Sequence, residues 1–96
     1  MKNEVSDEIR IFFARSKIRL EVLKSLDEKP QIASFLAHKM QKHREVISRV
    51  FLDLQNIGLA ECTNPESPSF RHYKITKRGK NILEELEKIG KYCKNT

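Results

Sequence analysis

In the first half of the chain, hydrophobic residues recur at intervals of three and four, the spacing of helices that bury one face. This pattern predicts helices over residues 7–14, 16–28, 34–40 and 43–57. Ser16 is suited to cap the second helix and Pro30 to end it. Gly58 is a natural stop for the fourth and longest helix. The expected buried face of that helix consists of Ile47, Val50, Phe51, Leu54 and Ile57.

After Gly58 the hydrophobic period changes from that of helices to that of strands. Residues 59–63 predict one strand, and residues 70–75 alternate large and polar side chains and predict the return strand. Between them, residues 64–69 contain two prolines and no helical signal. This segment therefore predicts the turn of a β-hairpin.

The last hydrophobic stretch follows Thr76, which can cap a helix. Its heptad-like stripe is longer than a small domain needs for its own core, and it favours packing against a second copy of the chain. An ordinary amphipathic helix lying on its own domain is the alternative. We expect the first and last helices to form the dimer, through Ile9, Phe12, Phe13, Ile82, Leu86, Ile89 and Cys93.

The order helix, helix, tight turn, helix, β-hairpin predicts a winged helix-turn-helix fold, mainly helical with the hairpin as the wing. The 96 residues are enough for one domain and not for two. We expect an N-terminal helical extension (1–15), a winged helix-turn-helix domain (16–76) and a C-terminal dimerisation helix (77–96).

Three segments in this order resemble the small archaeal and bacterial winged-helix regulators related to the ArsR and MarR groups. They are SKIRLEVLKSL (16–26), IASFLAHKMQKHREVISRVFLDLQNIGLAEC (32–62) and YKITKRGKNILEEL (73–86). The resemblance covers about three-quarters of the chain and implies a dimer that binds operator-like duplex DNA.

The sequence departs from this family at two places. Gln41 occupies the turn between the second and third helices of the motif, where the family usually has glycine, at a cost on the order of 1 kcal/mol. The predicted hairpin tip carries Glu66, where the family often has arginines. A strong contact between the wing tip and the minor groove is therefore not expected.

The formal net charge of +6 favours an anionic partner, and the positive charge is concentrated in two patches. One patch lies in residues 38–49 and the other in residues 71–80, which contain no acidic residue. If the apolar face of helix 43–57 points inward, the opposite face carries Arg44, Ser48 and Arg49. An arginine can form two hydrogen bonds with guanine, and serine can bond a base or a phosphate.

From this placement we expect helix 43–57 to enter the major groove of DNA. The predicted DNA-binding residues are Gln41, Lys42, His43, Arg44, Ser48, Arg49, Arg71, Lys74, Lys77 and Arg78. Simpler explanations stay open for some of them. Glu45 and Arg49 have the spacing of an exposed salt bridge. Ser48 can be an ordinary surface serine, and the cations of residues 77–80 can serve general solubility.

No arrangement of residues indicates catalysis, a metal site or a cofactor. Cys62 and the three histidines have no ligand spacing, and no nucleophile–base pair or carboxylate dyad occurs. Two cysteines do not form a disulfide framework, and no apolar run approaches the length of a membrane span. We therefore expect a cytoplasmic protein that is not an enzyme.

The function that follows is sequence-specific binding of double-stranded DNA by a homodimeric transcription regulator. Two alternatives remain: a protein-interaction module that docks an acidic partner, and a nonspecific architectural DNA-binding protein. A docking helix would expose apolar anchors, and the exposed face of helix 43–57 offers only Val46 and Leu52.

Overall fold

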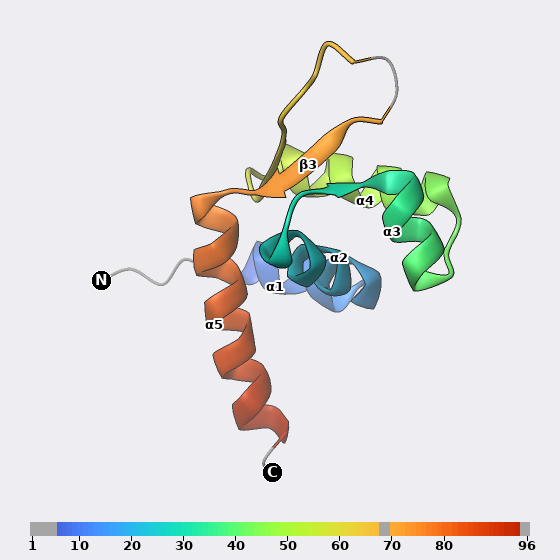
Figure 1. Cartoon of the computed structure of the whole chain (residues 1–96). Coiled ribbons are helices and arrows are strands. Elements are labelled where there is room, and N and C mark those ends of the chain that lie inside the picture. Colours follow the sequence, from blue (N-terminus) through green and yellow to red (C-terminus); the bar gives the residue numbers. More distant parts are fainter. Residues whose placement is uncertain (1–5, 68–69, 95–96) are drawn as a thin grey trace.

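The computed structural model describes residues 6–67 and 70–94, and within residues 89–94 it describes the helical backbone alone. These described residues form five helices arranged around a small sheet (Figure 1). In chain order the elements are α1 (Asp7–Ala14), α2 (Lys17–Glu28), β1 (Gln31–Ile32), α3 (Ala33–Met40), α4 (Arg44–Asn56), β2 (Ala60–Cys62), β3 (His72–Ile75) and α5 (Lys77–Lys94). The predicted helices and hairpin are confirmed, with bounds that differ by a few residues at most.

The structure adds one strand that the hydrophobic pattern does not predict. β1 follows Pro30 and pairs antiparallel with β3, so the sheet has the order β1-β3-β2. In this register Gln31 lies opposite Tyr73, which lies opposite Cys62 on the other side. A strand of two residues has no periodicity of its own. It exists because β3 supplies hydrogen bonds to an extended segment.

Helices α3 and α4 end with the same backbone motif. Gln41 and Gly58 both adopt left-handed backbone conformations, with φ of 59° and 81°. The following amides then bond back across the turn, from Lys42 N to Ala37 O at 2.8 Å and from Leu59 N to Leu54 O at 2.9 Å. This is a Schellman motif, in which glycine usually occupies the left-handed position. The predicted strain at Gln41 is therefore present in the structure.

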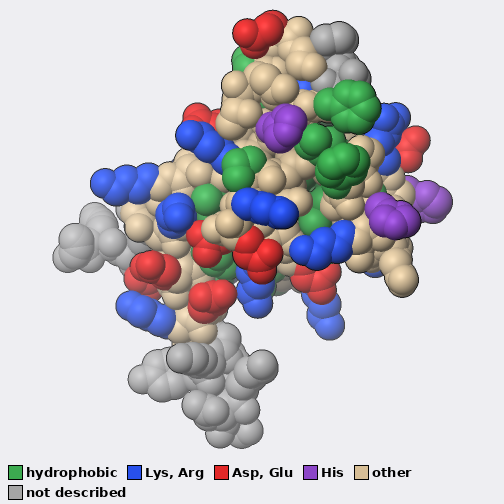
Figure 2. All heavy atoms as spheres, viewed as in Figure 1, with side chains coloured by type: hydrophobic (Ala, Val, Ile, Leu, Met, Phe, Trp, Pro, Cys, Tyr) green, Lys and Arg blue, Asp and Glu red, His purple; other side chains and the backbone are tan. Residues whose placement is uncertain are grey.

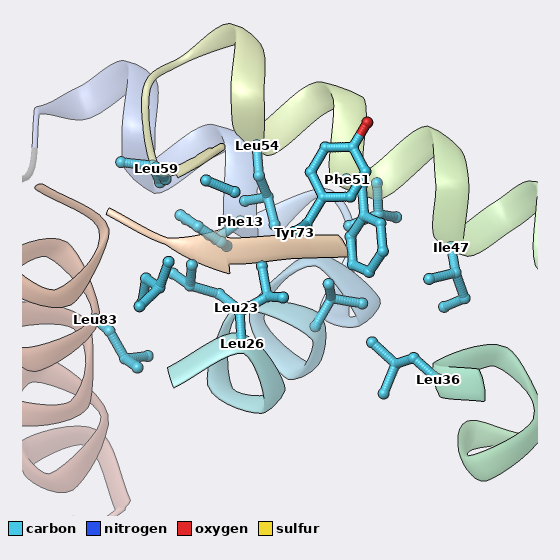
Figure 3. Packing of buried hydrophobic residues seen from close by; sticks show 14 of the residues in the cluster. Phe13, Leu23, Leu26, Leu36, Ile47, Phe51, Leu54, Leu59, Tyr73 and Leu83 are labelled. Atoms are coloured by element: carbon cyan, nitrogen blue, oxygen red, sulfur yellow. The ribbon is translucent and has the colours of Figure 1, made fainter. Parts of the chain in front are cut away.

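The hydrophobic core lies between α2, α4 and β3 (Figure 3). The buried residues of α4 are those predicted, except that Ile57 is only partly buried at the end of the helix. Phe51 contacts Tyr73 of β3, with ring centroids 4.7 Å apart. From α2 the core receives Val22, Leu23 and Leu26. On α3 the spacing of Phe35, Leu36 and Met40 suggests one shared side, but Leu36 is buried whereas Phe35 is 65% exposed.

The predicted dimer contacts must be corrected for three residues. Ile9 and Phe13 are each 6% exposed and Ile82 is 0% exposed, so the protomer's own core already covers them. Phe12 and Leu86 are partly buried and pack against the same core. Helical spacing identifies a buried face but not which molecule buries it. The side chains of Ile89 and Cys93 lie outside the described residues.

The junction between β3 and α5 explains the Y-x-I-T-x-x-G pattern of the sequence. Tyr73 and Ile75 point into the core. The Thr76 hydroxyl accepts a hydrogen bond from Gly79 N at 3.0 Å and donates one to Gly58 O at 2.7 Å. As predicted, Thr76 caps α5. A side chain at Gly79 would overlap the carbonyl oxygen of Leu59, so only glycine lets α5 approach this closely.

We expect Gly79→Ala to lower the free energy of unfolding by about 1–3 kcal/mol, because the added methyl group forces the backbones apart. Chemical denaturation followed by circular dichroism measures the change. Asn81→Ala, at an exposed position two residues further along α5, is the control and should stay within about 0.5 kcal/mol of the parent. Equal stability of the two variants would contradict this account of the junction.

Candidate nucleic-acid interface

One exposed stripe of α4 faces a hollow beside the hairpin. Arg44, Ser48 and Leu52 follow each other at intervals of four residues and therefore lie on one side of the helix. The hollow has a volume of about 290 Å³. The N-terminus of α3, with Ser34, and the wing, with Phe70 and Arg71, provide its other walls. The structure thus brings together Arg44, Ser48 and Arg71, three of the predicted DNA-binding residues from two distant parts of the chain.

The hollow is positively charged and partly apolar. Arg44 and Arg71 line it, and none of its lining residues is acidic. Among the residues that the structure describes, Arg44 has no hydrogen-bond or ion-pair partner, so its guanidinium is available to an external anion. Sequence reasoning missed Phe70 as part of this surface, because a hydrophobic residue at the start of a strand is normally expected in the core. Figure 2 shows hydrophobic side chains gathered beside the wing and over α3.

The N-terminus of α4 is open to an anion. His43 occupies the cap position but forms no hydrogen bond to the helix through its side chain. The first backbone N–H groups of a helix have no acceptor within the helix, and together they carry a partial positive charge. Lys42, His43 and Arg44 are all exposed there. Phosphate groups bind at such termini, so these residues fit their predicted role beside a DNA backbone.

Gln41 lies next to this terminus, but its clearest role is in the turn. Its backbone N–H bonds to His38 O at 3.2 Å, and its left-handed conformation sets the direction in which the chain enters α4. The side chain is exposed. Gln41 therefore sets the position of the start of α4, whatever its side chain contacts.

Arg49 lies on a different face of α4 from Arg44. It borders a second hollow, between α4 and the start of α2, together with Glu45 and Val46. In that hollow Arg19 pairs with Asp53 at 3.5 Å. In the part of the chain that the structure describes, Glu45 and Arg49 do not form the salt bridge that their spacing allows. Arg44 and Arg49 thus cannot share one small target.

The two predicted basic residues of the hairpin have partners within it. Lys74 pairs with Glu61 on the neighbouring strand at 3.5 Å, and both side chains are about half exposed. The Arg71 Nε donates a hydrogen bond to Ser67 O at 2.8 Å. An exposed pair of this kind contributes little to stability, so Lys74 can exchange its partner for a phosphate. Arg71 keeps guanidinium N–H groups beyond the one used for Ser67.

Arg78, another of the predicted DNA-binding residues, has a partner on a different element. Its Nη1 donates a hydrogen bond to Ile57 O at 2.9 Å, at the C-terminus of α4. This is the opposite end of the helix from Arg44, about 20 Å away along a 13-residue helix. Sequence reasoning grouped Arg78 with Lys77 because both are cations at the start of α5. The structure gives Arg78 a local role as a cap of α4, and it leaves Lys77 exposed.

The described residues include neither a metal site nor a membrane-spanning helix. No group of three His, Cys, Asp or Glu side chains in residues 6–67 and 70–88 is placed to hold a metal ion. No helix in the described part is long and apolar enough to cross a membrane. Cys62 is a free thiol, half-buried in β2.

Two solved structures are similar to this chain over most of its length. An ArsR-like transcriptional regulator from Rhodococcus sp. RHA1 has a TM-score of 0.60 and 28% sequence identity, over 88% of this chain and 80% of its own. A MarR family transcription regulator has a TM-score of 0.55 and 30% identity. That match covers 80% of this chain but only 54% of the MarR family protein, so this chain spans about half of its length.

These similarities confirm the winged helix-turn-helix fold and the resemblance to ArsR and MarR regulators predicted from the sequence. Both proteins are transcription regulators and not enzymes, in agreement with the prediction for this chain. No protein-family model and no curated protein sequence matches the chain.

We expect Arg78→Ala to lower the free energy of unfolding by about 1 kcal/mol, because it leaves the C-terminal carbonyl of α4 without its charged donor. Lys77→Ala should change stability by less than about 0.5 kcal/mol. Urea unfolding of the two variants measures this difference. If Arg78→Ala instead keeps full stability and weakens binding to a DNA duplex, its predicted phosphate contact would be correct after all.

Proposed function

We propose that this protein is a cytoplasmic transcription regulator that binds specific sequences in double-stranded DNA as a homodimer. In this proposal α4 enters the major groove and its Arg44 stripe contacts base edges. Arg71 and Lys74 of the wing contact the backbone on one side, while Lys42 and His43 do so at the start of α4. The similarity to ArsR and MarR regulators supports DNA binding and gene regulation in general.

The observation that carries the proposal is the Arg44 stripe itself. A helix fits the major groove, and its N-terminal residues reach the base edges. Arg44 is the first residue of α4 and Ser48 follows one turn later, both facing the acid-free hollow. Lys42, His43 and Arg44 are exposed together at the N-terminus of α4, a concentration of basic side chains that solubility alone does not require.

A homodimer is proposed from the length of α5. This helix has 18 residues and is about 27 Å long. Its first half packs on the core through Ile82 and Leu83, and its second half extends beyond the rest of the molecule (Figure 1). The sequence continues the apolar stripe of Ile82 and Leu86 through Ile89 and Cys93. In the proposed dimer this second half packs against a second copy of the chain.

A second candidate function is docking of an acidic protein partner, and one observation favours it. Phe35 and Phe70 are 65% and 63% exposed. Large apolar side chains at the centre of a surface often anchor protein partners. Lys39 lies in the same hollow as Phe35, which would suit an acidic partner.

The test is selection from a pool of random DNA duplexes, followed by affinity measurements at several salt concentrations. We expect a palindromic site whose two halves lie one or more helical turns apart, near 34 Å per turn. Arg44→Ala should lose preference at one base pair in each half, at a cost of about 1–3 kcal/mol. Arg10→Ala, at an exposed position on α1, is the matched control and should keep the preference.

Equal, salt-sensitive binding to all sequences would contradict specific recognition and favour an architectural protein. Absence of binding to any duplex, with the fold intact, would favour the protein-docking alternative.

Oligomeric state gives a separate prediction. We expect Ile89→Asp to convert the dimer to a monomer in light-scattering measurements while leaving the circular dichroism spectrum unchanged. Lys88→Asp introduces the same carboxylate at a neighbouring exposed position and should leave the dimer intact. A parent chain that is monomeric at micromolar concentration would contradict the dimer.

A further inference from the structure

Two apolar side chains remain exposed on the proposed DNA-binding surface. Leu52 is 47% exposed and continues the stripe of Arg44 and Ser48 by one more interval of four residues. Phe70 is 63% exposed on the wing. Both line the hollow that also holds Arg44 and Arg71. The surface is therefore polar and cationic at the start of α4 and becomes apolar toward its middle.

The wing holds Phe70 in place by an unusual backbone. Its φ of 54° lies in the left-handed region, which bulky residues rarely adopt. The Asn64 side chain forms hydrogen bonds with the backbone on both sides of this position. Its Nδ2 donates to Phe70 O at 3.3 Å, and its Oδ1 accepts from His72 N at 2.8 Å. The bond from Arg71 to Ser67 closes the same turn. The backbone at Phe70 is thus held by side chains of the wing, and its aromatic side chain lines the same hollow as Leu52.

We propose that Leu52 and Phe70 form an apolar contact for thymine, so that the protein recognises the C5 methyl group of a thymine on the same half-site as the base contacted by Arg44, a few base pairs away from it. This inference rests on the proposed binding of duplex DNA. The occupant follows from the surroundings, since an acid-free hollow with two arginines suits a polyanion. In the major groove, the methyl group of thymine is the apolar feature that the bases present.

The spacing along α4 limits where this thymine lies. Leu52 is eight residues after Arg44, about 12 Å along the helix axis. Successive bases on one strand are about 3.4 Å apart. A helix lying along the groove would therefore place the thymine about three to four base pairs from the base that Arg44 contacts. Ser48 lies between the two and faces the intervening pairs.

The test uses two random duplex pools, one containing thymidine and the other containing deoxyuridine in its place. Uracil keeps the hydrogen-bonding edge of thymine and lacks only the methyl group. We expect the parent protein to enrich an A·T pair at one fixed position of the thymidine pool, and to lose that enrichment in the deoxyuridine pool. On the selected site, thymine to uracil at this position should weaken binding about fourfold, the factor expected for one buried methyl-sized group.

Variants connect the effect to the two side chains. Leu52→Ala should bind the thymine and uracil duplexes equally, and Phe70→Ala should reduce the difference between them. Val46→Ala is the control, because Val46 is 40% exposed on α4 but borders the other hollow, with Arg49. It should keep the full preference for thymine.

The outcomes separate this inference from the proposed function. A selected sequence that the parent protein binds equally with thymine and with uracil would overturn the thymine contact while leaving specific DNA binding intact. A uracil effect that persists in Leu52→Ala would also overturn it. Failure to select any sequence from the thymidine pool would overturn both, and would favour a protein partner that docks on Phe35 and Phe70.

Discussion

The packing of the apolar face of α4 against α2 and β3 is the contact on which the rest of the structure depends. Burial of Ile47, Phe51 and Leu54 leaves one orientation for the helix, and that orientation turns Arg44 and Ser48 outward. The contact between Phe51 and Tyr73 also ties α4 to the central strand of the sheet. The wing, of which this strand is a part, is therefore held beside the same helix. The hollow between α4 and the wing thus results from core packing.

The sequence predicted this arrangement wherever a local rule was sufficient. The apolar period located α4 and its outward face, Thr76 located the start of α5, and Gln41 was predicted at a turn that requires a left-handed residue. β1 could not be predicted, because its two residues are a strand only through pairing with β3. The exposure of Phe35 and Phe70 could not be predicted either, since a hydrophobic residue is expected inside unless the surrounding elements leave it uncovered.

The candidate site shows the same division between local and tertiary information. Sequence alone identified ten residues as possible DNA contacts but could not tell which cations the fold already uses. The structure assigns Arg78 to the end of α4 and pairs Lys74 with Glu61, while Arg44 stays unpaired within the described residues. Likewise, the spacing of the terminal helices identified Ile9 and Ile82 as buried, but only the assembled protomer shows that its own core covers them.

The hydrogen bonds at the C-terminus of α4 limit how the length of this helix can change. They join that end to the start of α5, from Thr76 to Gly58 O and from Arg78 to Ile57 O. The rotation of α4 about its axis is therefore fixed at this end, about three and a half turns from Arg44. Inserting or deleting one residue within α4 would rotate everything on its N-terminal side by about 100°. Arg44 would then leave the hollow and the buried face would be broken. Without loss of the core, the chemistry of this surface can therefore change only by exchange of side chains at constant helix length.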